Sequence, residues 1–297
     1  MNAGERLPGT PEPLHLWATD GGLRVAADAW GDPSAPPVLL GHGGGQTRHA
    51  WRDTARRLAD AGYRAVACDS RGHGDTDWPD DGDYSLDAQI RGLQGLLATP
   101  AFAGPDGAPG RKPVLVGASM SAEIFLVGVG EGRIDAAGLV LVDYAPRTRE
   151  EGYQRNKAFM EAHAHGFASL EEVADAVASH RGGPRPARLD GLAKVVRRRA
   201  DGRLYWHWDA RLLDWRVREY PTRYARMAAA ARKLSLPTLL VRGGRSDVLS
   251  EEGAQEFLQM APHAEYVVIP EAGHMIAGDA NDAFGRAVLD FLGRAVI

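Results

Sequence analysis

A serine, an aspartate and a histidine each follow an apolar run of this sequence, and together they could perform nucleophilic catalysis. Ser119 lies in KPVLVGASMSAEI, Asp247 in LPTLLVRGGRSDVLS and His274 in YVVIPEAGHMIAG. A serine hydroxyl becomes an effective nucleophile when a histidine takes its proton and an acid orients that histidine. We therefore expect Ser119 as the nucleophile, His274 as the general base and Asp247 as the orienting acid.

The residues around Ser119 predict the sharp turn between strand and helix that such a nucleophile requires. The apolar run Pro113–Gly117 predicts a strand, and Met120–Val129 predicts a helix that begins directly after the serine. Small residues two positions before and two after the serine leave room for this turn. Gly117 meets the condition, whereas Ser121 departs from the usual glycine although its side chain is small.

The order of apolar runs predicts an α/β fold with a mostly parallel, eight-stranded sheet. Strands alternate with helices as far as Val142 and again from Leu236, and this alternation implies crossover helices on both faces. Because the carboxyl ends of parallel strands meet at one edge, the three residues can converge there. The predicted strands are Leu14–Ala18, Leu23–Trp30, Pro37–Leu40, Arg64–Cys68, Pro113–Gly117, Ala137–Val142, Pro237–Val241 and Glu265–Ile269.

The alternation stops between residues 145 and 234, where helical periodicity continues without a clear buried strand. We expect residues 1–144 and 235–297 to form one core domain, and residues 145–234 to form a helical cap inserted after the sixth strand. The cap contains LYWHWDARLLDW; if this run is extended, Trp206 and Trp208 share one face and His207 lies on the other. These three residues are predicted to form a wall of the substrate pocket. The alternative is a small core of the cap, with His207 in a structural role.

Backbone donors for a developing oxyanion are expected in the glycine-rich run Gly41–Gly45, directly after the third strand. Glycines allow the backbone to approach a carbonyl oxygen closely. We assign the donors to the N–H groups of Gly44 and Met120, with Gly45 as the alternative to Gly44. His42 is expected to brace this loop.

The chain resembles α/β-hydrolases that carry a cap domain, from about Leu14 to Phe291. The motifs that carry the resemblance are GHGGGQ, DSRGHGDTD, VGASMS, RGGRSDVLS and EAGHMI. The resemblance implies the chain order nucleophile, acid, histidine, which the three candidates follow. It also makes Asp143, in LVLVDYAP after the sixth strand, the alternative acid. The chain looks most similar to bacterial esterases and cofactor-free peroxidases.

This resemblance implies hydrolysis of a carboxylic ester or lactone through an acyl-enzyme, with no metal or organic cofactor. The substrate would be a small molecule with a carbonyl group. Three alternatives stay open: hydrolysis of a carbon–carbon bond in a ring-cleavage product, perhydrolysis, and binding of a small ligand without turnover. Ser119 argues against haloalkane dehalogenase and epoxide hydrolase activity, because members of this fold with those activities typically use an aspartate as nucleophile.

Composition and charge argue against several other classes of protein. The chain has 297 residues, 25% of them charged, and a formal net charge of −4, without the basic footprint of a nucleic-acid-binding protein. No run approaches the ~20 apolar residues of a membrane helix, and the first residues do not resemble a signal peptide. We therefore expect a cytoplasmic protein. Cys68, the only cysteine, is expected in the core, and the Pro- and Gly-rich opening up to Pro13 is expected to be disordered.

Overall fold

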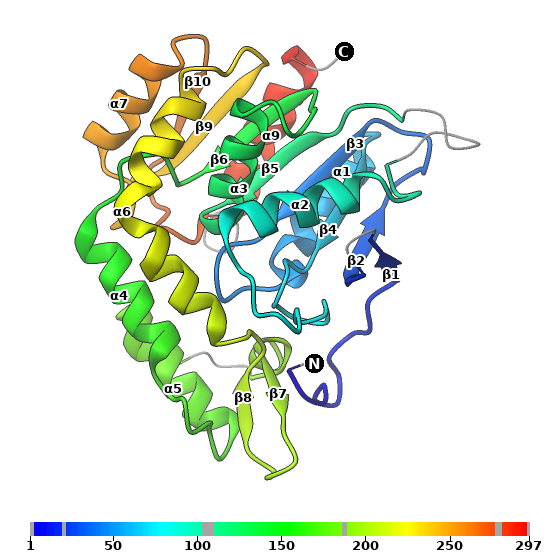
Figure 1. Ribbon diagram of the computed structural model, residues 1–297, viewed down its shortest axis with the longest axis vertical. Helices are drawn as coiled ribbons and strands as arrows, with labels where there is room; N and C mark the ends of the chain where they lie inside the picture. The colour runs from blue at the N-terminus through cyan, green and yellow to red at the C-terminus, as the bar shows by residue number, and fades with distance from the viewer. Residues whose placement is uncertain (1–2, 20–21, 103–109, 186–188, 277–280, 296–297) are drawn as a thin grey trace.

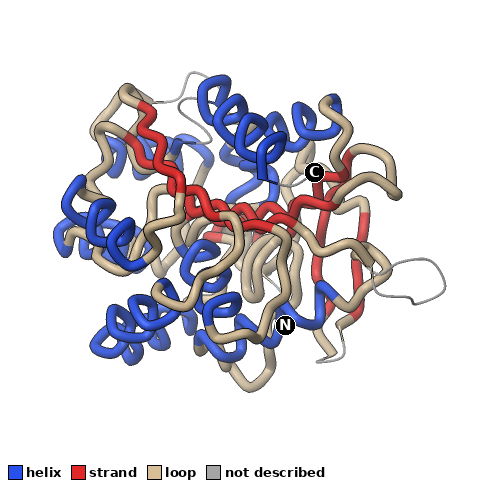
Figure 2. The backbone as a smooth tube through the Cα atoms, turned by 90° about the horizontal axis from the view of Figure 1, so that it is seen from above, coloured by secondary structure: helices blue, strands red, loops and turns tan. Residues whose placement is uncertain are grey.

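The computed structural model describes residues 3–19, 22–102, 110–185, 189–276 and 281–295. One eight-stranded sheet in the order β1-β2-β4-β3-β5-β6-β9-β10 forms its centre, with helices on both faces (Figure 1, Figure 2). β1 and β2 pair antiparallel to their neighbours, and the other pairs are parallel. The predicted α/β fold class is confirmed. The strands are β1 (His15–Ala18), β2 (Arg24–Trp30), β3 (Pro37–Gly41), β4 (Arg64–Cys68), β5 (Val114–Ala118), β6 (Gly138–Val142), β9 (Thr238–Gly243) and β10 (Glu265–Ile269).

Two hydrophobic clusters fill the space between the sheet and its helices. Leu39 belongs to one cluster and Leu40 to the other, because successive side chains of a strand point to opposite faces. Strands that are buried on both faces read as continuous apolar runs, as β3 does. Burial of Cys68 at the end of β4 raises the pKa of its thiol to about 12, as fits a core cysteine. The helices outside residues 145–234 whose bounds the structure describes are η1 (Arg48–Trp51), α1 (Arg52–Asp60), α2 (Leu86–Leu97), α3 (Met120–Gly130), α7 (Glu251–Met260) and α9 (Asn281–Ala295).

Residues 145–234, called the insertion below, separate β6 from β9 and contain two strands that the sequence did not predict. β7 and β8 pair antiparallel, and they lie with α4 and α5 at the lower end of the molecule (Figure 1). The sequence predicted helices here without a clear buried strand, and the structure adds this short pair of strands to the helices, because three-residue strands are too short to show a clear alternation of apolar residues. The elements are α4 (Glu150–Glu161), α5 (Leu170–Arg181), η3 (Leu192–Val195), β7 (Val196–Arg198), β8 (Leu204–Trp206) and α6 (Arg211–Ala231).

The end of α6 packs closely against the core helix α3. Gly130 permits this approach, since a Cβ there would lie 2.4 Å from the carbonyl oxygen of Ala230. Among the described residues, no helix combines the length and the apolar character needed to cross a membrane.

The opening residues pack against the insertion, and Figure 1 shows this segment beside β7. Glu5 and Arg198 exchange two backbone hydrogen bonds of 2.9 Å. Leu7 is buried, and the Thr10 hydroxyl donates to the carbonyl of Ala193 at 3.2 Å. The expectation of disorder up to Pro13 is therefore wrong for residues 3–13. Their partners lie far away along the chain, so no local pattern reveals the pairing.

Candidate active site

Ser119 lies at the turn between β5 and α3, in a backbone conformation that few non-glycine residues adopt. Its φ is 47° and its ψ is −107°, and such strain is typical of functional positions. Gly117 is required here, because a Cβ would lie 2.7 Å from the nitrogen of Ala122. The predicted strand–turn–helix around the serine is thus present.

Ser121 occupies the position where glycine is usual, and Gly41 on the neighbouring strand leaves room for its side chain. A Cβ on Gly41 would lie 2.6 Å from the Cβ of Ser121, so the space that Ser121 fills is left by Gly41. The hydroxyl of Ser121 donates to the carbonyl of His42 at 2.7 Å. This hydrogen bond ties the start of α3 to the loop that follows β3.

The acid that reaches His274 is Asp143, and not Asp247 as predicted. The Nδ1 atom of His274 lies 2.7 Å from Oδ2 of Asp143, which is fully buried after β6. The carboxylate of Asp247 instead pairs with Arg155 of α4, and its side chain is 31% exposed. The prediction for Asp247 is wrong because an aspartate that follows a strand can point toward the histidine or toward solvent. Sequence position alone does not distinguish the two.

Two hydrogen bonds, besides the contact with His274, hold the buried carboxylate of Asp143 in place. The N–H of Gly243 donates to its Oδ1 at 2.8 Å, and the hydroxyl of Ser246 donates to its Oδ2. The backbone of Asp143 has a φ of 52°, a second strained position among the site residues. These hydrogen bonds hold the carboxylate in one position, from which it can orient the imidazole of His274.

Ser119 and His274 line one cavity of about 900 Å³ between the sheet edge and the insertion. Trp206 and Trp208 form part of its wall, and their rings stack with centroids 4.9 Å apart and planes inclined by 11°. A Cβ on Gly45 would lie 3.3 Å from the ring of Trp208, so this glycine lets the insertion approach the loop closely. The structure therefore brings both predicted tryptophans to the cavity.

His207, the third residue predicted for this wall, points away from the cavity into the protein. The N–H of Gly74 donates to its Nδ1 at 2.7 Å, and its Nε2 lies 3.2 Å from the carbonyl oxygen of Gly45. Burial lowers the pKa of His207 well below its usual value, so the ring is neutral. The alternative of a structural histidine fits this position, whereas contact with a substrate does not.

Within the described part of the chain, neither the N–H of Gly44, which lines the cavity with Ser119, nor the N–H of Met120, which follows Ser119, donates a hydrogen bond. They are the two donors that the sequence predicts for an oxyanion. The alternative donor, Gly45 N–H, already donates to Nε2 of His73 at 3.3 Å.

His42 braces the same loop, as expected. Its Nδ1 lies 2.8 Å from the carbonyl oxygen of Gly43, and its Nε2 accepts a hydrogen bond of 2.9 Å from the N–H of Ser70. Burial lowers the pKa of this histidine, which keeps the ring neutral. His42 therefore supports the loop from the interior of the protein, while residues 43–46 line the cavity on the other side.

The comparison with known families agrees with this geometry. The profile of the Alpha/beta hydrolase family matches residues 38–287. The chain belongs to the alpha/beta hydrolase family.

Two relatives of this alpha/beta hydrolase are named as hydrolytic enzymes. The chain is 30% identical to an esterase of Mycobacterium tuberculosis over 279 residues, 90% of this chain and 86% of the relative. It is 26% identical to a 3-hydroxybutyrate-oligomer hydrolase of Cupriavidus necator, over 84% of this chain and 87% of the relative. The chain is a hydrolase.

Solved structures share the fold of this alpha/beta hydrolase. The crystal structure of E-2-(acetamidomethylene)succinate hydrolase superposes with a TM-score of 0.80 at 21% identity, over 94% of this chain and 100% of the other. The structure of the Mycobacterium tuberculosis esterase has a TM-score of 0.70 at 25% identity, over 95% and 93%.

In this alpha/beta hydrolase, the Asp75 carboxylate joins the core to the insertion. It accepts hydrogen bonds of 2.9 Å from Arg48 of the core and from Arg197 of β7, both buried. Burial alone would raise the pKa of Asp75, but Arg197 and Arg48 outweigh it and hold this pKa below its usual value. The charged link stays intact at neutral pH.

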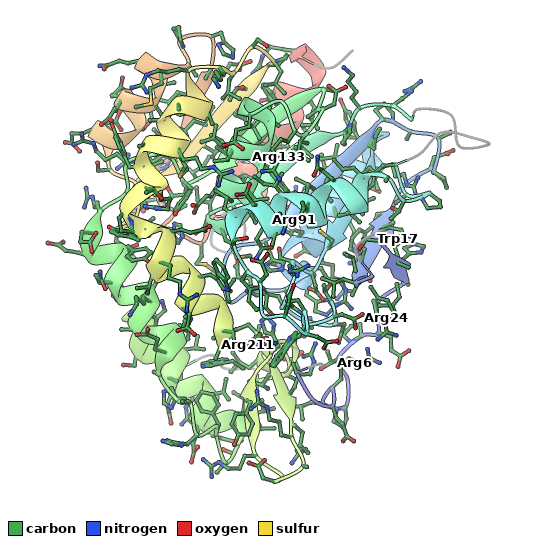
Figure 3. The ribbon with its side chains drawn as sticks, viewed as in Figure 1. Arg6, Trp17, Arg24, Arg91, Arg133 and Arg211 are labelled. Atoms are coloured by element: carbon green, nitrogen blue, oxygen red, sulfur yellow. The ribbon has the colours of Figure 1, made fainter. Side chains whose placement is uncertain are left out.

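A second anchor lies at the start of α6, where Figure 3 labels Arg211. Its guanidinium pairs with Asp209 and donates to the carbonyl oxygens of Pro79 at 3.0 Å and Asp80 at 3.3 Å. The insertion is thus fixed to the core on two sides of β8, which carries Trp206 and leads into His207 and Trp208.

Proposed function

We propose that this hydrolase cleaves carboxylic esters or lactones through Ser119, His274 and Asp143, with an acyl-enzyme intermediate. The contact of 2.7 Å between His274 Nδ1 and Asp143 Oδ2 carries the proposal. It orients a histidine that lines the same cavity as a serine at a strained turn, and nucleophilic catalysis by serine requires such a pair.

The first half of the reaction forms the acyl-enzyme. Because Nδ1–H of His274 donates to Asp143, the other ring nitrogen is free to take the proton of the Ser119 hydroxyl. Oγ of Ser119 then bonds to the carbonyl carbon, and the carbonyl oxygen becomes an oxyanion. The N–H groups of Gly44 and Met120 stabilise it, and one such donor typically lowers the barrier by about 3–4 kcal/mol.

The second half returns the enzyme to its starting state. His274 gives its proton to the leaving alcohol as the carbon–oxygen bond breaks. A water molecule then loses a proton to His274 and attacks the acyl-enzyme, and the acid leaves as Ser119 regains its proton. Asp143 accepts the hydrogen bond from Nδ1–H of His274 and stabilises the protonated imidazole in both steps.

We further propose that residues 145–234 act as a cap that shapes the substrate site. The cavity of about 900 Å³ has room for an ester of small to medium size, and apolar and aromatic side chains make up much of its wall. Trp206 and Trp208 would hold the apolar part of the substrate through their stacked rings. The esterase and the oligomer hydrolase among the relatives support ester cleavage.

Hydrolysis of p-nitrophenyl acetate and butyrate by the wild type and by Ser119→Ala tests the proposal. Loss of the nucleophile should lower turnover by about 10⁴-fold or more. Circular dichroism and thermal unfolding must show that the variant folds as the wild type does. An active variant would contradict the role of Ser119. If neither protein acts, carbon–carbon bond hydrolysis or ligand binding without turnover becomes the better hypothesis.

A further inference from the structure

Three buried histidine rings contact one another in succession and contact the oxyanion loop, the name used here for residues 43–46. The ring centroids of His42 and His73 are 5.1 Å apart, and those of His73 and His207 are 5.7 Å apart. All three side chains are fully buried, and they are not among the described residues that line the cavity. His42 and His73 come from core loops, whereas His207 comes from the insertion.

The hydrogen bonds of His207 determine which of its ring nitrogens carries the proton. Nδ1 accepts a hydrogen bond from the N–H of Gly74 at 2.7 Å, so it has no proton of its own. In the neutral ring, the proton is then on Nε2, which donates to the carbonyl oxygen of Gly45 at 3.2 Å. The insertion thus supplies a donor to the oxyanion loop.

Two peptide groups connect this donor to the predicted oxyanion site. The carbonyl of Gly45 and the N–H of Gln46 belong to one planar peptide group, and they point in opposite directions. That N–H donates to the carbonyl oxygen of Gly43 at 3.1 Å. The carbonyl of Gly43 in turn shares a peptide group with the N–H of Gly44, which lines the cavity beside Ser119.

We propose that His207 is a positioning residue that aims the Gly44 N–H at the oxyanion through these two peptide groups. The inference rests on the proposed function, because it concerns the oxyanion of that reaction. Hydrogen bonds in a chain also polarise one another, so the donor from His207 strengthens the bond that Gly44 offers. The oxyanion hole is therefore complete only when the insertion is seated on the core.

Two substitutions of His207 separate its two hydrogen bonds. In His207→Asn, the side-chain oxygen replaces Nδ1 and still accepts from Gly74, but the donor to Gly45 is lost. In His207→Gln, the amide nitrogen reaches the position of Nε2 and can donate to Gly45. The control is Val173→Ala, which shortens a fully buried side chain of α5 in the insertion's own hydrophobic cluster and is compared at matched thermal stability.

The measurements are kcat and KM for p-nitrophenyl butyrate, and the inhibition constant of phenylboronic acid. The boronate becomes tetrahedral on Ser119 and carries an oxygen in the place of the oxyanion. Outright loss of an oxyanion donor costs 10²–10³-fold in kcat, and misdirection of one should cost about tenfold. We expect His207→Asn to lower kcat and boronate affinity by about tenfold, with KM changed by less than about threefold. His207→Gln should regain most of this loss.

Several outcomes would overturn the assignment. They are an unchanged kcat in His207→Asn, a loss equal to that of Val173→Ala, or a glutamine variant no better than the asparagine variant. The Ser119→Ala variant is assayed in parallel. If it hydrolyses the ester as fast as the wild type, the proposed function falls and this assignment falls with it. If Ser119 is essential and His207→Asn matches the wild type, this assignment alone falls.

A measurement on the wild type decides the matter if the variants do not fold. Nitrogen-15 spectra of the histidine rings distinguish the two neutral tautomers. His207 should carry its proton on Nε2, and His42, whose Nε2 accepts from Ser70, should carry its proton on Nδ1. A His207 ring protonated on Nδ1 would exclude donation to Gly45 and overturn the proposal.

Discussion

The loops after β6 and β9 each carry an aspartate that the sequence offered as the partner of His274, and the surroundings of the two carboxylates are opposite. Asp143 is fully buried, has a strained backbone and accepts from Gly243 and Ser246. Asp247 is partly exposed and pairs with Arg155, itself more than half exposed. A carboxylate can orient a histidine only if its own position is fixed, and burial with satisfied hydrogen bonds fixes Asp143. An exposed pair such as that of Asp247 contributes about 0–1 kcal/mol to stability.

The largest expected effect is that of Asp143→Asn, which tests the buried half of this comparison. The amide cannot stabilise a protonated His274, and its NH₂ group favours the wrong tautomer of the ring. We expect kcat for p-nitrophenyl butyrate to fall by about 10³–10⁴-fold, with little change in KM. Steady-state kinetics measures this, with circular dichroism as the control for folding. Activity within tenfold of the wild type would show that another group orients His274.

A smaller effect should appear in the pH dependence of stability. A buried group whose pKa is shifted by folding makes the free energy of unfolding depend on pH, whereas an exposed group with nearly the same pKa in both states does not. Burial lowers the pKa of His42, His49 and His207, and that of His49 falls to about 4. The folded pKa lies below the unfolded value of about 6.5, so the unfolded chain binds more protons between these values. The stabilisation is complete above pH 6.5 and is lost as the pH falls toward 4.

Urea unfolding measured from pH 8.0 to pH 4.5 tests this prediction. Below about pH 6.5, the free energy of unfolding should decrease by up to about 1.4 kcal/mol per pH unit for each histidine that is neutral in the folded state. His49→Gln removes one of these groups and should flatten the slope. A constant free energy of unfolding over this range would mean that the three rings titrate as they do in the unfolded chain.

Much of the fold could be predicted from sequence, because it is encoded locally. Continuous apolar runs predicted the strands, and small residues around Ser119 predicted its turn. The choice between the two acids could not be made in this way. It depends on the pairing of β6 with β9, which brings Asp143 beside the Gly243–Ser246 turn. One sequence signal is Ser246, the residue before Asp247, because its hydroxyl donates to Asp143, the aspartate that contacts His274.

Contacts between distant segments also explain what the sequence did not predict about the insertion. The alternation of Trp206, His207 and Trp208 correctly put the tryptophans on one face and the histidine on the other. The partners of His207 are Gly45 and Gly74, which come from separate core loops. A pattern within one segment shows which side chains share a face, but not what the opposite face meets.

The smallest expected effect is that of Asp247→Asn, the matched partner of Asp143→Asn. The substitution keeps the size of the side chain and removes a charge that is 31% exposed and paired only at the surface. We expect kcat to stay within about threefold of the wild type and stability to change by less than about 1 kcal/mol. Because Asp247 lines the cavity with Arg155, a change confined to KM would locate it at the substrate and not at the histidine. A loss of kcat as large as that of Asp143→Asn would contradict the comparison, since it would mean that the exposed aspartate moves to His274 during turnover.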